Sequence, residues 1–545
     1  MFAGGDRVYP GCMKVRLAAL TAAALLTVPA AASAATTPQP PMVLPGDATA
    51  SSVRAADSTW IVGARPTAEA RAIARRFGAR QVGPAGTGGY VIGRTKARAF
   101  AGALGSLLVY AQPDTLAEPL AAVPNDPLSA TPYNWRALVA DPALTPPAVT
   151  PTSPLIALID AQLDKTHPDL ANSNTQTIPQ FPVTISHGTA TASVAAAPQN
   201  GIGIVGVWPN ARALNLPLPA EITCSRSANQ IEKAIENRAA VINMSYGSRG
   251  LCMPEYVALQ FAVARGIVPV AAAGNEFNEG NPPEFPASLP HVLTVAAVGP
   301  DLKSSIFSNA NEAIDLSAPG ENVMTDVPPA LDGDGTQDGF EAQSGTSFSA
   351  PMVAGAVAWV RAARPTLTGD QVNQAIRLSA TDIGQPGWER DTGFGLLSVG
   401  NALQITPPPP DPGEPNDDIV WVDGRAFGKP DRLFFNGRGK KRLIGLLDTF
   451  EDPGDVYRIR LRPHSRAKVR ATPAGSDDVA LYAFTKKAKR VRRNKALKKA
   501  SHRRRGRTEH FVLRNRSGKK KVYYLAIEVQ PKARDLDAVY TLRVG

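Results

Sequence analysis

The chain has little cysteine, few aromatic residues and no long apolar run, and each shortage excludes a class of protein. Three cysteines in 545 residues are too few for a disulfide-dense scaffold, and no group of His and Cys has zinc-site spacing. No apolar stretch reaches the ~18 residues that a membrane-spanning helix needs, so we expect no membrane span. Aromatic residues make up only 6% of the chain, but hydrophobic residues reach 43%, which suffices for several domain cores.

The charge is unevenly placed along the chain. The formal net charge is +12, which for a uniformly basic chain would indicate a nucleic-acid or polyanion binder. Counted by segment, the net charge is +6 over residues 1–119, −12 over residues 120–410 and +18 over residues 411–545. An acidic middle is therefore joined to a basic C-terminal part, and the overall charge alone assigns no function.

The N-terminal segment has the pattern of an export signal. Met13–Arg16 is basic, Leu17–Val28 is apolar, and Ala32–Ala34 has the small-x-small pattern of a cleavage site. We therefore expect a signal peptide over residues 1–34, with translation starting at Met1 or Met13, and a secreted, extracellular protein. The alternative is an N-terminal core helix.

A small α+β unit is expected over residues 57–119, after a Pro/Thr/Ala-rich linker over residues 35–56. Its strand-like runs are Trp60–Gly63 and Tyr90–Ile92. Its helical segments are Ala68–Phe77, which ends at Gly78, and Arg98–Leu107.

Residues 120–406 alternate between apolar strand-like runs and helical segments, which predicts an α/β domain. Such alternation is typical of a mostly parallel sheet covered by helices on both faces, in three layers. Ser227 and Thr368 are expected to cap two of the helices. The expected strands are Leu155–Ile159, Ala240–Met244, Ile267–Ala272 and Val292–Val298, and the helices are His187–Ala197, Ala228–Arg238, Glu255–Arg265 and Gly369–Leu378.

A proline-rich linker over residues 407–413 closes this domain, and a basic β-sandwich or barrel is expected over residues 414–545. The evidence is a set of short alternating segments, Val456–Leu461, Val479–Phe484, Val522–Val529 and Val539–Val544.

Three motifs in the middle domain carry candidate chemistry. An apolar run delivers Asp160 and continues to His167–Leu170, Ser186–Thr189 opens a helix of small residues, and Ser344–Pro351 opens another. Each motif alone is commonly structural, as a cap or a buried core residue. Together they supply the nucleophilic hydroxyl, the imidazole base and the orienting carboxylate that acyl transfer needs.

The order Asp…His…Ser, with its local motifs, resembles the subtilisin-like serine proteases (subtilases, peptidase family S8) over about residues 120–403. The resemblance implies that Asp160 orients the imidazole, His187 is the general base and acid, and Ser347 is the nucleophile. Asn275, in Val270–Asn275, would donate to the oxyanion. These roles describe an endopeptidase that works through an acyl-enzyme and needs no cofactor for catalysis.

The resemblance also implies a substrate-binding site, and one position in it stays open. An extended polypeptide would pair with the strand around Ser245, Tyr246 and Gly247, and Ala272, Ala273 and Gly274 would form the other wall of the P1 pocket. The alternative is an ordinary core strand. Glu284 precedes Phe285–Ala287, where many family members have glycine. It either lies in the pocket and favours a basic P1 residue or is solvated on a Pro-rich loop.

Two departures from the family pattern leave a second function open. Ala161 replaces the usual Ser or Thr after the aspartate, and Ala190 replaces the second histidine of His-Gly-Thr-His. Neither change removes a triad group. The alternative function is a catalytically weak or inactive protein that binds polyanions or surfaces through its basic tail.

Structural calcium and a disulfide are further expectations. The loop after His187 matches the family's calcium loop in spacing, so Asp169, Asn200 and the carbonyls of Ile202 and Ile204 would be ligands, together with Asp126; the alternative is a Gly-rich turn without an ion. The Asp477–Asp478 and Asp452–Asp455 loops of the tail are weaker ion candidates. With Met13 as the start, Cys224 and Cys252 remain, and they form either a disulfide or two thiols.

The flanking parts resemble companions of secreted peptidases. The unit before residue 119 resembles a subtilase propeptide, which would inhibit the enzyme and be cleaved off by it near Ala117–Val123. The tail resembles the pre-peptidase C-terminal domain. Its segment Lys486–Lys521 holds 18 Lys and Arg against one acid, Glu509, and is either a solvated basic loop or a contact for polyanions such as cell-wall polymers. Aromatic residues are nearly absent there, so we expect no specific nucleic-acid binding.

Overall fold

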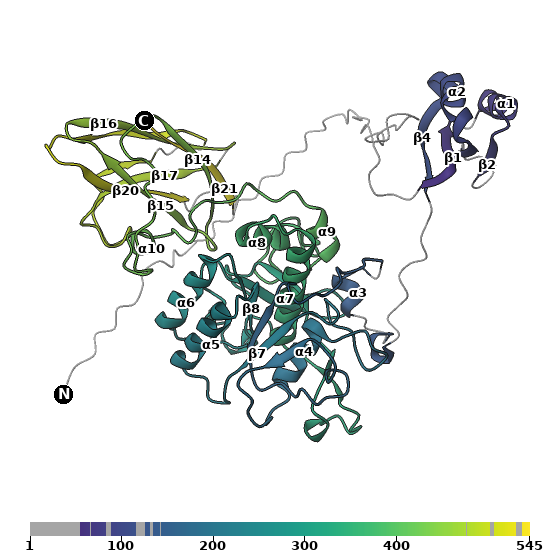
Figure 1. Ribbon diagram of the computed structural model, residues 1–545, viewed down its shortest axis with the longest axis horizontal. Helices are drawn as coiled ribbons and strands as arrows, with labels where there is room; N and C mark the ends of the chain where they lie inside the picture. Colours follow the sequence, from purple (N-terminus) through teal and green to yellow (C-terminus); the bar gives the residue numbers. More distant parts are fainter. Residues whose placement is uncertain are drawn as a thin grey trace, which may run out of the picture. The chain divides into compact units, whose positions relative to one another are not determined.

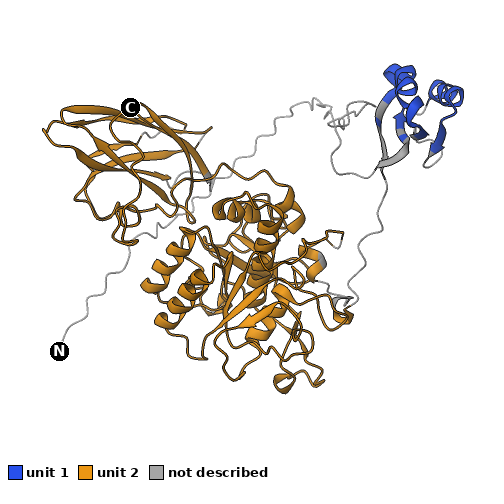
Figure 2. Ribbon diagram, in the orientation of Figure 1, with its two compact units in different colours: residues 1–118 blue, residues 119–545 orange. Residues whose placement is uncertain are grey.

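The computed structural model divides the chain into two compact units, residues 1–118 and 119–545 (Figure 2). The expected signal peptide, nearly all of the expected linker over residues 35–56 and the expected cleavage region Ala117–Val123 lie outside the described residues. The described residues are 55–65, 67–82, 89–115, 126–130, 135–141, 143–475, 477–501, 506–529 and 537–545.

The first unit is a four-stranded antiparallel sheet with two helices. The sheet has the order β2-β3-β1-β4, and the buried rings of Trp60 and Phe100 belong to one core. Helix α1 has the expected bounds and ends at Gly78 with φ 71°, but α2 begins at Arg94, four residues earlier than expected. The elements are β1 (Ala55–Ala64), α1 (Ala68–Phe77), β2 (Arg80–Val82), β3 (Gly89–Gly93), α2 (Arg94–Leu104) and β4 (Leu108–Thr115).

The larger unit is built on a seven-stranded parallel sheet of order β11-β10-β9-β8-β5-β7-β6. Two of its strands, β7 and β8, are labelled in Figure 1. The strands are β5 (Ile156–Asp160), β6 (Thr175–Thr177), β7 (Ala213–Pro217), β8 (Val241–Met244), β9 (Val268–Ala272), β10 (Leu293–Val298) and β11 (Leu316–Pro319). All of them except β6 are buried at every residue, as expected for a sheet that is covered on both faces. The predicted mostly parallel α/β fold is therefore confirmed.

Helices cover the two faces because successive strand residues point to opposite sides. On β5, Ile156 and Leu158 belong to the same core as residues of α4 and α7, whereas Ala157 and Ile159 belong to the core with α5 and α6. The helices are α3 (Trp135–Val139), α4 (His187–Ala196), α5 (Cys224–Glu236), α6 (Met253–Val263), α7 (Thr346–Ala363), α8 (Gly369–Leu378) and α9 (Val399–Gln404). A small antiparallel pair, β12 (Val323–Asp326) and β13 (Phe340–Gln343), precedes α7.

The C-terminal part is a β-sandwich, as predicted. Two four-stranded antiparallel sheets have the orders β14-β21-β16-β19 and β15-β20-β17-β18. Val469 and Leu542 of the first sheet share one core with Leu481 and Leu525 of the second. The elements are α10 (Ile419–Val422), β14 (Lys441–Asp448), β15 (Gly454–Leu461), β16 (Ser465–Pro473), β17 (Val479–Thr485), β18 (Lys498–Ala500), β19 (Glu509–Asn515), β20 (Lys521–Val529) and β21 (Asp537–Val544).

Two local predictions were wrong. Helix α5 begins at Cys224 with Thr223 at its N-cap, so Ser227 lies within the helix, where its hydroxyl donates to the Cys224 carbonyl at 3.1 Å. The basic segment Lys486–Lys521 is not one solvated loop, because β18 and β19 lie within it. Thr368 caps α8 as predicted, through a hydrogen bond from the Gln371 N–H to its hydroxyl. Among the helices described here, none is both long enough and apolar enough to cross a membrane.

Candidate active site

Three neighbouring strands end in polar residues at one edge of the parallel sheet. Asp160 is the last residue of β5, Ser245 follows β8, and Asn275 lies three residues after β9. These strands are adjacent in the order β9-β8-β5. Because the carboxyl ends of parallel strands meet at the same edge, the sheet gathers residues that are far apart in sequence, and such edges are where α/β folds build their sites.

Asp160 and His187 form the central hydrogen bond of this site. His187 begins α4, and its Nδ1 lies 2.6 Å from the Asp160 Oδ1. The Asp160 side chain is almost fully buried, whereas the His187 side chain keeps 32% of its surface exposed. The imidazole is thus held on one side by a buried carboxylate and remains open to solvent on the other.

Asp160 has two further hydrogen-bond partners. The Ala161 N–H donates to Oδ1 at 2.7 Å, and the Thr191 hydroxyl donates to Oδ2 at 3.1 Å. Ala161 stands directly after the aspartate, where a Ser or Thr was expected, and has no hydroxyl. Thr191 provides a hydroxyl beside the carboxylate instead. Sequence reasoning missed Thr191; the available signal was its position four residues after His187, on the same face of a helix.

The pKa of His187 is raised above its ordinary value. Burial lowers this pKa, but the charge of Asp160 and the hydrogen bond to it outweigh the effect of burial. A neighbouring carboxylate stabilises the protonated imidazole, which is the form produced when a histidine accepts a proton from a nucleophile.

Ser347 is the second residue of α7, and the residue after it packs against the histidine. The ring of the next residue, Phe348, is 5.7 Å from the His187 ring between centroids. In the described part of the chain, the Ser347 hydroxyl donates to the Ser245 carbonyl at 3.4 Å, while the Ser245 hydroxyl donates to the Ser347 carbonyl at 2.8 Å. Hydrogen bonds of a catalytic serine are often long or misaligned without substrate.

Asn275 is oriented by the residue that precedes Ser347. Its Oδ1 accepts hydrogen bonds from both the N–H and the hydroxyl of Thr346, at 2.9 and 3.0 Å. The Thr346 hydroxyl also accepts from the Gly274 N–H at 3.2 Å. With the carbonyl oxygen engaged, the amide NH₂ of Asn275 is left to donate to another group.

Glu284 lies between the two segments that were expected to form the P1 pocket. A Cβ at Gly247 would lie 3.0 Å from the Glu284 Oε2, and a Cβ at Gly274 would lie 2.8 Å from its Cγ. Gly274 itself needs glycine, because its φ is 104° and a Cβ would lie 2.3 Å from the Asn309 Nδ2. The small residues on both sides therefore make room for the acidic side chain.

The alternative that Glu284 is solvated is wrong, because only 5% of the residue is exposed. Burial, with a contribution from Glu276, raises its pKa, and Arg249 opposes this rise. The Arg249 Nε is 4.0 Å from the Glu284 Oε1, and the same guanidinium contacts Glu279 at 3.2 Å.

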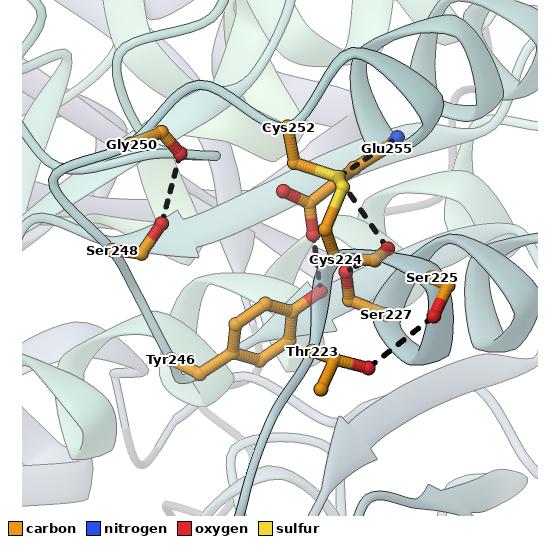
Figure 3. Close-up of a disulfide and its surroundings, with 9 residues drawn as sticks. All are labelled: Thr223, Cys224, Ser225, Ser227, Tyr246, Ser248, Gly250, Cys252 and Glu255. Carbon is orange, nitrogen blue, oxygen red and sulfur yellow. Dashed lines mark hydrogen bonds between the residues drawn. A yellow bond between two sulfur atoms is a disulfide. The ribbon is translucent and has the colours of Figure 1, made fainter. Parts of the chain in front are cut away.

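The expected Cys224–Cys252 disulfide is present and lies next to the expected substrate-binding strand (Figure 3). It joins the start of α5 to the N-cap of α6, where the Cys252 sulfur accepts a hydrogen bond from the Glu255 N–H. Glu255 in turn accepts the Tyr246 hydroxyl at 2.9 Å. The disulfide and Glu255 thus anchor Tyr246, which lies between Ser245 and Gly247.

The expected calcium loop gathers its residues, and several of its side-chain oxygens already accept hydrogen bonds. Both carboxylate oxygens of Asp169 accept hydrogen bonds, from the Asn200 Nδ2 at 3.0 Å and from the Ile204 N–H at 3.1 Å. The Asn200 Oδ1 accepts the Ile202 N–H at 2.9 Å, and the Asn200 N–H donates to Asp126 at 3.1 Å. Donors point at both Asp169 oxygens, whereas among the described residues the Asp126 Oδ2 is buried without a hydrogen-bond partner. The loop therefore fits either an ion or a turn without one.

A second acidic group fits a cation better. It contains His291 of the α/β domain and five carboxylates from the segment around Glu414, the loop before β15 and the start of β15. Candidate ligand atoms lie within 4.8 Å of one another in each of two overlapping sets, His291–Glu414–Asp417–Asp452 and Asp411–Glu414–Asp452–Asp455. In the part of the chain that the structure describes, one carboxylate oxygen of each of Asp411, Asp452 and Asp455 is buried without a hydrogen-bond partner.

Comparison with known proteins identifies the family of the α/β domain. Residues 152–395 match the model of the Subtilase family. The chain is 34% identical to subtilisin from Bacillus pumilus over 284 residues, which is 50% of this chain and 98% of that protein. It is 32% identical to subtilisin E from Bacillus subtilis over 283 residues, 50% of this chain and 71% of that protein. The crystal structure of fervidolysin from Fervidobacterium pennivorans covers 84% of this chain and 85% of its own, with 18% identity and a TM-score of 0.45. The chain belongs to the subtilase family of serine proteases.

Proposed function

We propose that the protein is a secreted serine endopeptidase, made as a zymogen that cleaves its own chain. The Ser347 hydroxyl attacks the scissile carbonyl, and His187 takes its proton and later gives it to the leaving amine. Asp160 holds the imidazole and stabilises its charged form. The Asn275 amide and the Ser347 N–H stabilise the oxyanion, and water then hydrolyses the acyl-enzyme. These groups supply every proton transfer that the reaction needs, so catalysis requires no cofactor.

The 2.6 Å hydrogen bond between Asp160 and His187 carries this proposal, because Ser347 and Asn275 lie at the same sheet edge. A protein that used the fold only for binding would have no need of a solvent-open imidazole against a buried carboxylate. The contact from Thr191 compensates for Ala161, which was the departure that most favoured an inactive protein.

A serine-directed phosphonate tests the proposal. It should modify the processed enzyme at Ser347 and leave the Ser347→Ala variant unmodified, as intact mass will show. The modification rate should fall as the pH drops through the raised pKa of His187, because only the neutral imidazole accepts a proton. Equal labelling of both proteins, or of neither, would contradict the assignment of the nucleophile.

The P1 pocket is proposed to prefer a basic residue. Glu284 places a buried carboxylate between Gly247 and Gly274. These two glycines belong to the two segments that would flank the P1 side chain. A substrate guanidinium or ammonium would pair with this carboxylate in competition with Arg249, whose Nε remains 4.0 Å away.

The acidic group around Glu414 is proposed to hold a structural calcium ion. Calcium takes six to eight oxygen ligands, and five carboxylates offer enough of them. Burial, reinforced by neighbouring carboxylates, raises the pKa of Glu414 and of Asp452 well above ordinary values. His291 contacts two of these carboxylates, and a bound cation would further offset the repulsion among the five. His291, which precedes β10, contacts Glu414 at 3.4 Å and Asp417 at 3.3 Å, so the acidic group lies where the sandwich meets the catalytic domain.

Calcium should raise the melting temperature of chelator-treated protein by about 5 °C or more at saturation. The Asp452→Asn variant should show no calcium-dependent rise, yet it should melt no lower than the wild type in chelator, because one repelling charge is gone. Asp301→Asn, which changes an exposed acid, should keep the full rise. A rise that survives in Asp452→Asn and disappears in Asn200→Ala would place the ion in the other loop.

A further inference from the structure

The outer face of one sheet of the sandwich carries a continuous row of cations. Paired residues of adjacent strands place Arg442 of β14 opposite Arg543 of β21, Arg543 opposite Arg470 of β16, and Arg470 opposite His510 of β19. One residue from each of the four strands thus stands in the row, and all four are exposed. Neighbouring strands are about 4.8 Å apart, so three guanidiniums span about 10 Å.

Further cations extend this basic face on one side of the row. Lys468 exchanges backbone hydrogen bonds with Gly545, whose Cβ position would lie 2.8 Å from the Lys440 Cγ. Beyond them, Arg466 stands opposite Arg514. One shallow cavity of about 490 Å³ lies on this face. It is lined by Lys440, Lys441, Arg442, Lys468, Arg470, Arg543, Val544 and Gly545.

Placing like charges directly opposite each other destabilises a sheet. Three such arginine pairs occur here: Arg442 with Arg543, Arg543 with Arg470, and Arg466 with Arg514. Among the ion pairs of the described residues, none involves these five arginines. A face that only kept the protein soluble would be expected to mix both signs of charge. The row is therefore a cost to folding that an anionic ligand would remove.

We propose that this basic face binds a linear phosphodiester polymer that lacks bases, of the kind found in cell walls. Guanidinium groups recognise phosphate oxygens through paired hydrogen bonds, and a row perpendicular to the strands suits an extended chain that crosses them. The exposed residues of these four strands on this face are Arg, Lys, His and Ile444, with no aromatic ring except that of His510, so bases would find little on which to stack. The proposal does not depend on the proteolytic activity.

The face overlaps the basic segment Lys486–Lys521 in β19, at His510 and Arg514. Lys486, Lys487 and Arg493 of that segment lie around the turn after β17, outside the row. They are exposed cations of the same domain, so they provide a matched control that removes the same charge from another place.

Binding of fluorescent poly(glycerol phosphate) to the full chain, in a Ser347→Ala background that prevents self-cleavage, tests the proposal. Replacing Arg442, Arg470 and Arg543 together with Gln should weaken binding on the order of 30-fold at low salt and reduce the salt slope of log K by about 2, since three phosphate contacts are lost. Replacing Lys486, Lys487 and Arg493 with Gln should weaken it less than threefold. The polymer should also raise the melting temperature of the parent and not that of the sheet-face variant.

Folding of the sheet-face variant is checked in the same experiment. Removing opposed cations should leave its melting temperature without polymer unchanged or higher, so a loss of binding cannot be ascribed to unfolding. Equal weakening in both triple variants would show that net charge alone is responsible and would overturn the proposal, as would no binding by the parent at 50 mM salt. Tighter binding of heparin or of oligo-dT of equal charge would overturn the assignment to a base-free phosphodiester.

Discussion

Replacing Ser347 with alanine is expected to lower kcat on the order of a million-fold, the largest effect of any single change in this chain. The loss is so large because the triad acts as a unit: His187 and Asp160 remain paired at 2.6 Å but have no hydroxyl to activate. Hydrolysis of a peptide substrate by purified wild-type and variant proteins measures this effect.

The same variant reports on processing. If the unit over residues 57–119 is a propeptide removed by the enzyme itself, the Ser347→Ala chain should stay uncut in the region Ala117–Val123 when made in a protease-deficient host. Thr346→Ser is a suitable control, because it keeps a hydroxyl beside Asn275 and leaves the nucleophile intact. Normal cleavage of the Ser347→Ala chain would contradict self-processing. The role of Ser347 as the nucleophile would then be tested only by the kcat comparison.

The second large effect is expected at Glu284. The wild type should cleave after Arg in preference to Leu, and Glu284→Gln should lower kcat/KM for the Arg substrate about 100-fold, because the substrate cation would then be buried without a partner. Cleavage after Leu should change little or improve. Paired peptides that differ only at P1 measure the ratio.

Glu279→Gln provides the matched control for this prediction. Glu279 contacts the same Arg249 at 3.2 Å, but its side chain is 72% exposed, so its loss should leave the Arg-to-Leu ratio unchanged. The ratio should also fall as the pH drops through the raised pKa of Glu284, since only the carboxylate attracts the substrate cation. Protonation of His187 affects both substrates alike and cancels in the ratio. A Leu preference in the wild type would refute the acidic pocket.

Local signals in the sequence were sufficient where a single segment decides its own structure. The apolar run before Asp160 predicted β5, because a strand buried on both faces must be apolar throughout. Thr368 predicted the start of α8, because a hydroxyl there satisfies the first free N–H groups of a helix. Strand β7 was missed, because Asn215 interrupts its apolar pattern; the Asn215 side chain is paired inside the protein, where it donates to the Ala161 carbonyl at 2.9 Å.

Contacts between distant segments could not be read in this way. Ser227 has the residue type of an N-cap, yet Thr223 takes that role, and the helix starts at the cysteine that is bridged to Cys252. Thr191 is an ordinary helix residue until β5 brings Asp160 beside it. The acids around Glu414 belong to two segments, and His291 to another domain, so only folding makes them one group.

The sequence by itself determined the family, the α/β class and the identity of the candidate catalytic residues, because the chemistry of acyl transfer restricts which side chains occur in which local motif. The tertiary structure decided what surrounds them: that Glu284 is buried between Gly247 and Gly274, that Asp169 accepts hydrogen bonds where ligands to calcium were expected, and that Arg442, Arg543 and Arg470 form one row. These features depend on strand order and register, which arise from packing across the whole chain and leave no trace in any one segment.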